Sequence, residues 1–174
     1  TMLVARFAGA ATLSAAYVIV VYLVACVITE VTGDWTPDHL ITPALGLALG
    51  VAIIAALSLL ASTILSVTAQ GIVVFMVFGA GLTAGLLAQI GNAINSDSLH
   101  DIGRVASWSL PFEGLYMASL HALISDTTGL TGVVLQLGPF GGSEAAGPGL
   151  IAWAFVYLLG VLALAAFVFS RRDL

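Results

Sequence analysis

Long runs of apolar residues dominate the chain, and shorter, more polar stretches separate them. A helix needs roughly 20 mostly apolar residues to cross the hydrocarbon core of a bilayer. Four runs meet this length without containing Asp, Glu, Lys, Arg or His. They predict four transmembrane helices, at residues 7–29, 43–65, 71–90 and 149–170. Pro43 suits the first turn of its helix, and the stretch SVTAQ (66–70) predicts a tight hairpin between the second and third spans.

The arginines predict how these spans are oriented. Four spans place both ends of the chain on one side of the membrane, so Arg6, Arg171 and Arg172 lie together and Arg104 lies alone opposite them. Arg and Lys collect on cytoplasmic flanks. The pattern therefore predicts a multi-pass membrane protein with its C-terminus in the cytoplasm.

The segment between the third and fourth spans, residues 91–148, has a different pattern. After the polar stretch NAINSDSLHDIGR it contains two apolar pieces, 110–124 and 129–140, each too short to cross the membrane. Broken structure at membrane depth is stable only when it packs against protein or lines a wet cavity. The pattern predicts re-entrant or interfacial short helices on the outer face.

The stretch SLPFEGLYMASLHAL (109–123) needs a separate test as a fifth span. Such a span would separate Arg6 from the C-terminal arginines, and an acid such as Glu113 near the bilayer centre costs about 2.5–3.5 kcal/mol. Pro111 instead fits the start of a short helix, and Glu113 in its first turn faces the positive end of the helix dipole. One apolar side is predicted for this helix, interrupted by Ser119, and its members are Phe112, Leu115, Tyr116, Leu120 and Leu123.

Composition and charge narrow the class of protein. The chain has 174 residues, of which 60% are hydrophobic and 7% are charged, whereas a soluble domain carries about 25% charged residues. An all-α, polytopic membrane protein is the expected fold class, with residues 1–174 forming a single transmembrane domain. Four scattered arginines and no lysine give no basic stripe for nucleic acid.

The sequence lacks the motifs of several common enzyme and transporter classes. A Walker A loop requires lysine, so this chain cannot hold one, and neither His-Glu-x-x-His nor Gly-x-Ser-x-Gly occurs. The spans carry no carboxylate or histidine for a proton relay. Asp97, His100 and Asp101 could cluster on one helical turn, but a polar loop is the simpler interpretation, and His121 is better explained as an interfacial residue than as a ligand. We therefore expect no catalytic, cofactor or metal site.

Two Gly-x-x-x-Gly patterns occur inside spans, at Gly46–Gly50 and at Gly81–Gly85. Glycines four residues apart form a flat helix face that allows another backbone to approach closely. They are candidates for helix packing, including packing across a dimer. Chance spacing in a chain rich in glycine and alanine is the alternative.

The order of these features resembles the C-terminal two-thirds of an ABC-2 type permease, the membrane subunit of a bacterial ATP-driven exporter. Arg6 precedes a span rich in small residues, RFAGAATLSAAYVIVVYL, and a tight hairpin follows. SLPFEGLYMASLHAL then precedes the last span, which runs into FSRRDL (169–174).

The resemblance implies that these are the third to sixth of six spans, and that an N-terminal part with the ATPase-docking helix precedes residue 1. It implies a permease of a prokaryotic inner membrane that works as a dimer, homomeric or heteromeric, among membrane lipids. Its partner would be a separate ATPase subunit that binds ATP and Mg²⁺. Arg6, Arg171 and Arg172 would be cytoplasmic anchors, and the outer gate or re-entrant candidates are Leu110, Pro111, Phe112, Glu113 and Tyr116. The alternatives are a membrane scaffold or assembly subunit without transport activity and, less well supported, a membrane-embedded enzyme.

Overall fold

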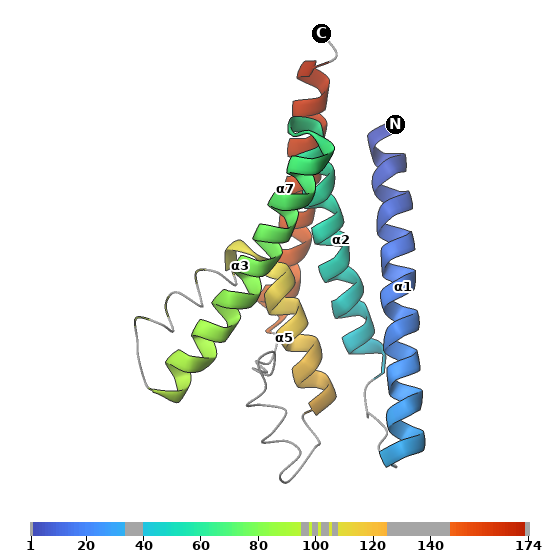
Figure 1. Ribbon diagram of the computed structural model, residues 1–174, viewed down its shortest axis with the longest axis vertical. Coiled ribbons are helices and arrows are strands. Elements are labelled where there is room, and N and C mark those ends of the chain that lie inside the picture. Colours follow the sequence, from blue (N-terminus) through green and yellow to red (C-terminus); the bar gives the residue numbers. More distant parts are fainter. Residues whose placement is uncertain are drawn as a thin grey trace.

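The protein is all-α and polytopic. The computed structural model describes residues 2–33, 40–94, 98, 101, 105, 108–124 and 147–172. Within these residues, four helices are long and apolar enough to span a membrane. They are α1 (Met2–Gly33), α2 (Ile41–Ile64), α3 (Val67–Ala93) and α7 (Pro148–Arg172), and a shorter helix, α5 (Pro111–Ile124), precedes α7 (Figure 1). The expected fold class is confirmed.

The described helices are longer than the apolar runs that predict them. The first run, 7–29, lies inside α1, which includes Arg6 and Glu30 and ends at Gly33. Hydropathy marks the part of a helix that fits the hydrocarbon, whereas backbone hydrogen bonds continue into the flanks until a helix-breaking residue intervenes.

The turn between α2 and α3 is shorter than SVTAQ suggests. Leu65 and Ser66 alone are extended there, and α3 already begins at Val67. Ser66 has the extended backbone of an N-cap residue, and its carbonyl accepts a hydrogen bond from the Gln70 N–H at 2.8 Å. The Gln70 side chain turns back to α2, where Nε2 donates to the Ser58 hydroxyl at 2.8 Å and to the Ser58 carbonyl at 3.1 Å. These two hydrogen bonds tie the first turn of α3 to α2.

Helix α2 lies at the centre of the bundle and packs against each of the other described helices. Its buried positions are mostly small or compact, and they are Pro43, Gly50, Ile53, Ala56 and Thr63. Small side chains allow helix axes to approach closely, and van der Waals packing drives helix association in lipid. The core contains Ile53 of α2, Phe112 and Leu115 of α5, and Ala154 of α7.

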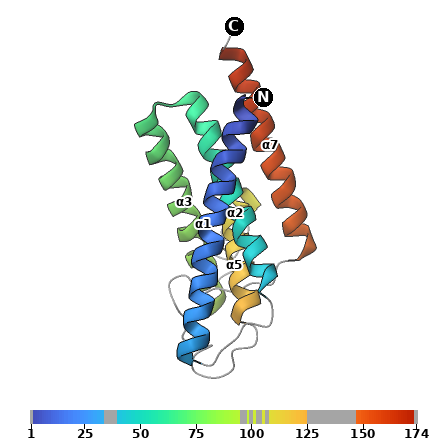
Figure 2. The same ribbon diagram turned by 90° about the vertical axis from the view of Figure 1, so that its right-hand side faces the viewer.

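Both ends of the chain lie at the same end of the bundle, as does the turn between α2 and α3 (Figure 1). Helix α5 occupies the opposite half, and α7 runs from that half back to the end with the termini (Figure 2). This arrangement agrees with an even number of spans.

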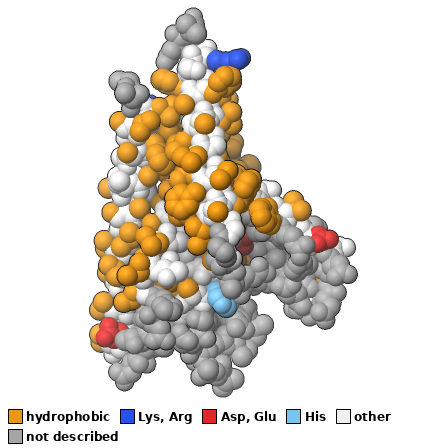
Figure 3. All heavy atoms as spheres, turned by 180° about the vertical axis from the view of Figure 1, so that it is seen from behind, with side chains coloured by type: hydrophobic (Ala, Val, Ile, Leu, Met, Phe, Trp, Pro, Cys, Tyr) orange, Lys and Arg blue, Asp and Glu red, His pale blue; other side chains and the backbone are white. Residues whose placement is uncertain are grey.

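Hydrophobic side chains cover the long helices on the face shown in Figure 3, while the visible arginine lies at one end and the acidic and histidine side chains lie toward the other. Exposed apolar residues of this size are atypical of a soluble monomer. On α1 alone they include Leu13, Tyr17, Val20, Val24 and Val31. They form the surface that a bilayer would cover.

Candidate functional site

Helix α5 begins where its sequence predicts. Pro111 is its first residue, where the missing N–H would have no helical acceptor. The Glu113 N–H donates to the Leu110 carbonyl at 3.1 Å, and the Glu113 side chain lies in the first turn. The Ser119 hydroxyl donates to the Leu115 carbonyl one turn earlier at 2.7 Å, which satisfies the hydroxyl within the helix.

The prediction that α5 has a single apolar side is wrong in one respect. Helix α5 contacts α2, α3 and α7, so it is buried on several sides rather than along one stripe. Tyr116, Leu120 and Leu123 are only half-buried. Ser119 and Glu113 are instead 4% and 6% exposed. The bundle encloses α5 within the half opposite the termini, and position in this enclosure decides burial, not side-chain hydrophobicity.

The glycine pair of α2 forms one seat for α5. A Cβ atom at Gly46 would collide with the Ser119 hydroxyl oxygen, and a Cβ atom at Gly50 would lie 3.6 Å from the Phe112 carbonyl oxygen. The absence of side chains at these two positions therefore allows α5 to lie directly against the α2 backbone.

The glycine pair of α3 forms a second seat on another side of α5. A Cβ atom at Gly81 would lie 2.8 Å from Cζ of Phe112, and one at Gly85 would collide with Glu113 Oε1. Both Gly-x-x-x-Gly faces thus meet the same short helix. Both glycine pairs therefore pack against α5 within this chain.

Helix α7 closes a third side. Gly114 of α5 faces Leu150, since a Cβ atom at Gly114 would lie 3.1 Å from a Leu150 methyl group. Just before α5, the Trp108 carbonyl accepts a hydrogen bond of 2.8 Å from Nε1 of Trp153. The two indole rings lie 5.8 Å apart, and Tyr157 continues this aromatic row along α7. These contacts tie the entry of α5 to the last span.

A cleft of about 440 Å³ lies between α2 and α3 over the start of α5. We call it the α5 cleft. Its described lining is apolar apart from Glu113 and the Tyr116 phenol, and it comprises Gly46, Leu47, Gly50, Val51, Ile54, Phe78, Leu82, Phe112, Glu113 and Tyr116. Burial raises the pKa of the Tyr116 phenol, so this group keeps its proton and remains a hydrogen-bond donor.

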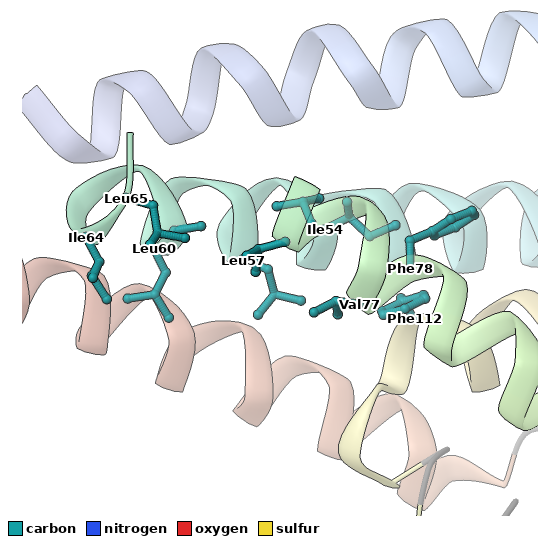
Figure 4. A pocket seen from close by; sticks show the side chains of 11 residues that line it. Ile54, Leu57, Leu60, Ile64, Leu65, Val77, Phe78 and Phe112 are labelled. Carbon is teal, nitrogen blue, oxygen red and sulfur yellow. The ribbon is translucent and has the colours of Figure 1, made fainter. Parts of the chain in front are cut away.

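A second hollow of about 260 Å³ continues from the α5 cleft toward the α2–α3 turn. The two hollows share Ile54, Phe78 and Phe112. Figure 4 shows Phe112 beside Phe78 at one end of the second hollow and leucines of α2 along it. Its described lining is entirely apolar. We call it the tail hollow.

The predicted arginine anchors lie near the end with the termini. Arg6 borders a more polar cleft between α1, α2 and α3, whose lining also includes Ser58, Ser62 and Gln70. The exposed Arg171 guanidinium lies 4.4 Å from the centre of the Phe167 ring, a cation–π contact. Arg172 is the last residue of α7.

Other sequence predictions fall partly outside the described residues. The second apolar piece, 129–140, lies outside them, as do Arg104 and the Asp97 and His100 of the weighed metal cluster. Asp101 is exposed. No group of three metal-ligating side chains occurs in the described part of the chain.

The sequence did not single out every residue that shapes the site. Phe78 and Leu82 of α3 line the α5 cleft, and Met117 lies beside Gly85. Within a uniformly apolar span, hydropathy does not distinguish a residue that faces a cleft from one that faces lipid. The four-residue spacing of Phe78 and Leu82 was the available signal, and it is common in such helices.

No protein-family model matches this chain, and neither does any curated protein or solved structure.

Proposed function

We propose that this chain is the permease part of an ABC exporter that moves amphipathic compounds outward, powered by a separate ATPase subunit. The observation that carries the proposal is the enclosure of α5. A short helix seated on glycine faces of two spans, bordered by an apolar cleft and tied to the last span, fits a gate between the membrane and the outer side. The resemblance of the sequence to ABC-2 type permeases supports the same function.

Membrane orientation is part of the proposal. The end with Arg6 and Arg171 would face the cytoplasm of a prokaryotic cell and the α5 half would face outward. A second permease subunit would complete the translocation path. ATP and Mg²⁺ would be bound by the ATPase, and this chain would contribute a change in helix packing.

The contacts that α5 makes with the glycine faces of α2 and α3 suit a change in helix packing. Small-residue contacts hold a helix through close backbone approach and do not interlock long side chains. Movement of α2 relative to α3 would open or close the α5 cleft, since the two spans form its opposite walls. Substrate would enter from the apolar region and leave past Phe112 and Tyr116.

The test expresses the full-length protein together with candidate ATPase subunits from the same organism. We expect one of these subunits to copurify with the protein, and the pair to extrude an amphipathic dye from the cytoplasmic side in proteoliposomes, with ATP required. An ATPase variant unable to hydrolyse ATP is the matched control and should abolish transport. Failure to recover any ATPase would overturn the proposal and favour a scaffold or assembly role.

A further inference from the structure

We propose that the α5 cleft binds an amphipathic organic cation, with Glu113 as its counter-ion and the tail hollow as the seat of its apolar chain. The proposal names the substrate class of the exporter and in this sense rests on the proposed function. The binding itself requires neither ATP nor an ATPase.

The first argument is charge. Glu113 is 6% exposed and is the sole ionisable acid or base, apart from the Tyr116 phenol, among the described residues that line the α5 cleft. Carboxylates at membrane depth are costly and mark substrate or ion pathways. The N-terminal dipole of α5 offsets only roughly half a unit charge. A carboxylate has about four acceptor positions, so one that is held within the protein can also face a cationic head in the cleft that it lines.

The second argument is the aromatic wall of the cleft. The Phe78 and Phe112 rings are stacked, with centroids 6.0 Å apart and planes inclined by 20°, and Tyr116 lines the same cleft. Aromatic faces attract organic cations through the ring quadrupole, and more strongly when water is excluded. A carboxylate beside aromatic rings suits an alkylammonium group. A bare divalent metal ion would need about six oxygen ligands, which this lining does not supply.

The third argument is the continuity of the two hollows. Ile54, Phe78 and Phe112 belong to both linings, so a ligand with its head at Glu113 can extend its chain into the tail hollow. A neutral lipid chain would gain the apolar contacts of the tail hollow but would make no charge-assisted contact with the carboxylate. The carboxylate and the tail hollow together therefore favour an amphiphile with a positively charged head.

The experiment measures equilibrium binding of tritiated dodecyltrimethylammonium to the full-length protein in phosphatidylcholine nanodiscs, with empty nanodiscs subtracted. Unlabelled dodecyltrimethylammonium should displace the label at concentrations at least about tenfold lower than 1-dodecanol or dodecyl sulfate do, as expected for an ion pair in a cleft of low dielectric constant. Equal potency of the cationic and neutral compounds would show a lipid-chain groove and would overturn the proposal.

Matched variants test the role of the carboxylate. Glu113→Gln keeps the side-chain shape but removes the charge, and it should weaken cation binding about tenfold or more, whereas Glu30→Gln removes an exposed acid of α1 and should change nothing. Retained affinity in Glu113→Gln, or equal loss in Glu30→Gln, would overturn the proposal.

Leu82→Trp gives an independent test if Glu113→Gln does not fold. The larger side chain would fill the α5 cleft from α3 and should abolish the specific binding of tritiated dodecyltrimethylammonium. Unchanged binding would place the site elsewhere. The binding assay contains no ATP, so the two proposals can fail separately. ATP-driven export by a protein whose cation binding does not depend on Glu113 would contradict this inference alone. Binding without ATP-driven export contradicts the proposed function alone.

Discussion

The longest and the shortest described helices, α1 and α5, differ in what they bury: α1 leaves most of its large apolar side chains exposed, whereas α5 buries apolar and polar side chains alike. Helix α1 is 32 residues long and exposes a row of large apolar residues, including Leu13 at 76% exposure. Helix α5 has 14 residues and buries both Glu113 and Ser119 among its neighbours. In a soluble protein the apolar helix would be the buried one.

The difference follows from the solvent of the two helices. Lipid tails are as apolar as leucine, so α1 gains little hydrophobic free energy from leaving them, and it packs mainly against α2. Polar groups instead need partners at membrane depth, and the Ser119 hydroxyl finds one within α5, at the Leu115 carbonyl, while α2, α3 and α7 enclose the helix. The packing of α5 therefore holds more of the folding free energy per residue than that of α1, and substitutions can test this.

The largest expected effect comes from matched leucine truncations. Leu115 of α5 is 2% exposed, so Leu115→Ala should leave a cavity in the core and destabilise the fold by about 2–5 kcal/mol. Leu13→Ala on α1 should change stability by no more than about 0.5 kcal/mol. Thermal unfolding in detergent, followed by size-exclusion chromatography, measures both. Equal losses would remove the distinction between the two helices.

A pair of glycines on α3 gives the next effect, with opposite signs. Gly81→Ala would press Cβ against the Phe112 ring and should cost about 1–3 kcal/mol. A Cβ atom at Gly79 would meet no atom of another helix within 4 Å, so Gly79→Ala should be neutral or stabilise by up to about 1 kcal/mol through helix propensity. The same unfolding assay applies. A stabilising Gly81→Ala would contradict the close seat of α5 on α3.

A double-mutant cycle tests the seat on α2. Gly46→Ala should be destabilising because its Cβ meets the Ser119 hydroxyl, but Ser119→Ala removes that oxygen and leaves the serine Cβ 3.6 Å away. The double variant should therefore recover about 1 kcal/mol relative to the sum of the single variants. Additive losses, measured by thermal unfolding, would show that the two positions do not touch.

The smallest effect concerns the place where α1 is anchored. The Tyr22 hydroxyl donates to the Leu40 carbonyl at 3.2 Å, and Tyr22 is the buried large residue of α1 among those described. Tyr22→Phe should cost about 0.5–1.5 kcal/mol through the lost hydrogen bond. Tyr17→Phe on the exposed face is the control and should have no measurable effect on unfolding. A larger loss for Tyr17 would indicate an unseen contact on that face.

The sequence was sufficient to predict the elements. Spans near residues 7–29, 43–65, 71–90 and 149–170 follow from run length and hydropathy, because a bilayer requires about 20 apolar residues in a helix. The short helix after Leu110 follows from Pro111 and Glu113, whose preference for a first helical turn is local. These signals depend on neighbouring residues and on the membrane as a solvent, so a single sequence carries them.

Only the tertiary structure decided which faces meet. Gly46 and Gly81 could serve a dimer, a packing contact or nothing by spacing alone, and the structure places α5 against both. Likewise, the sequence pattern predicted that Ser119 interrupts the apolar side of α5. In the structure, three helices enclose α5 and bury Ser119 together with Glu113. Hydrophobicity cannot choose helix faces inside an apolar solvent. Close approach and polar satisfaction choose them, and both depend on residues distant in the sequence.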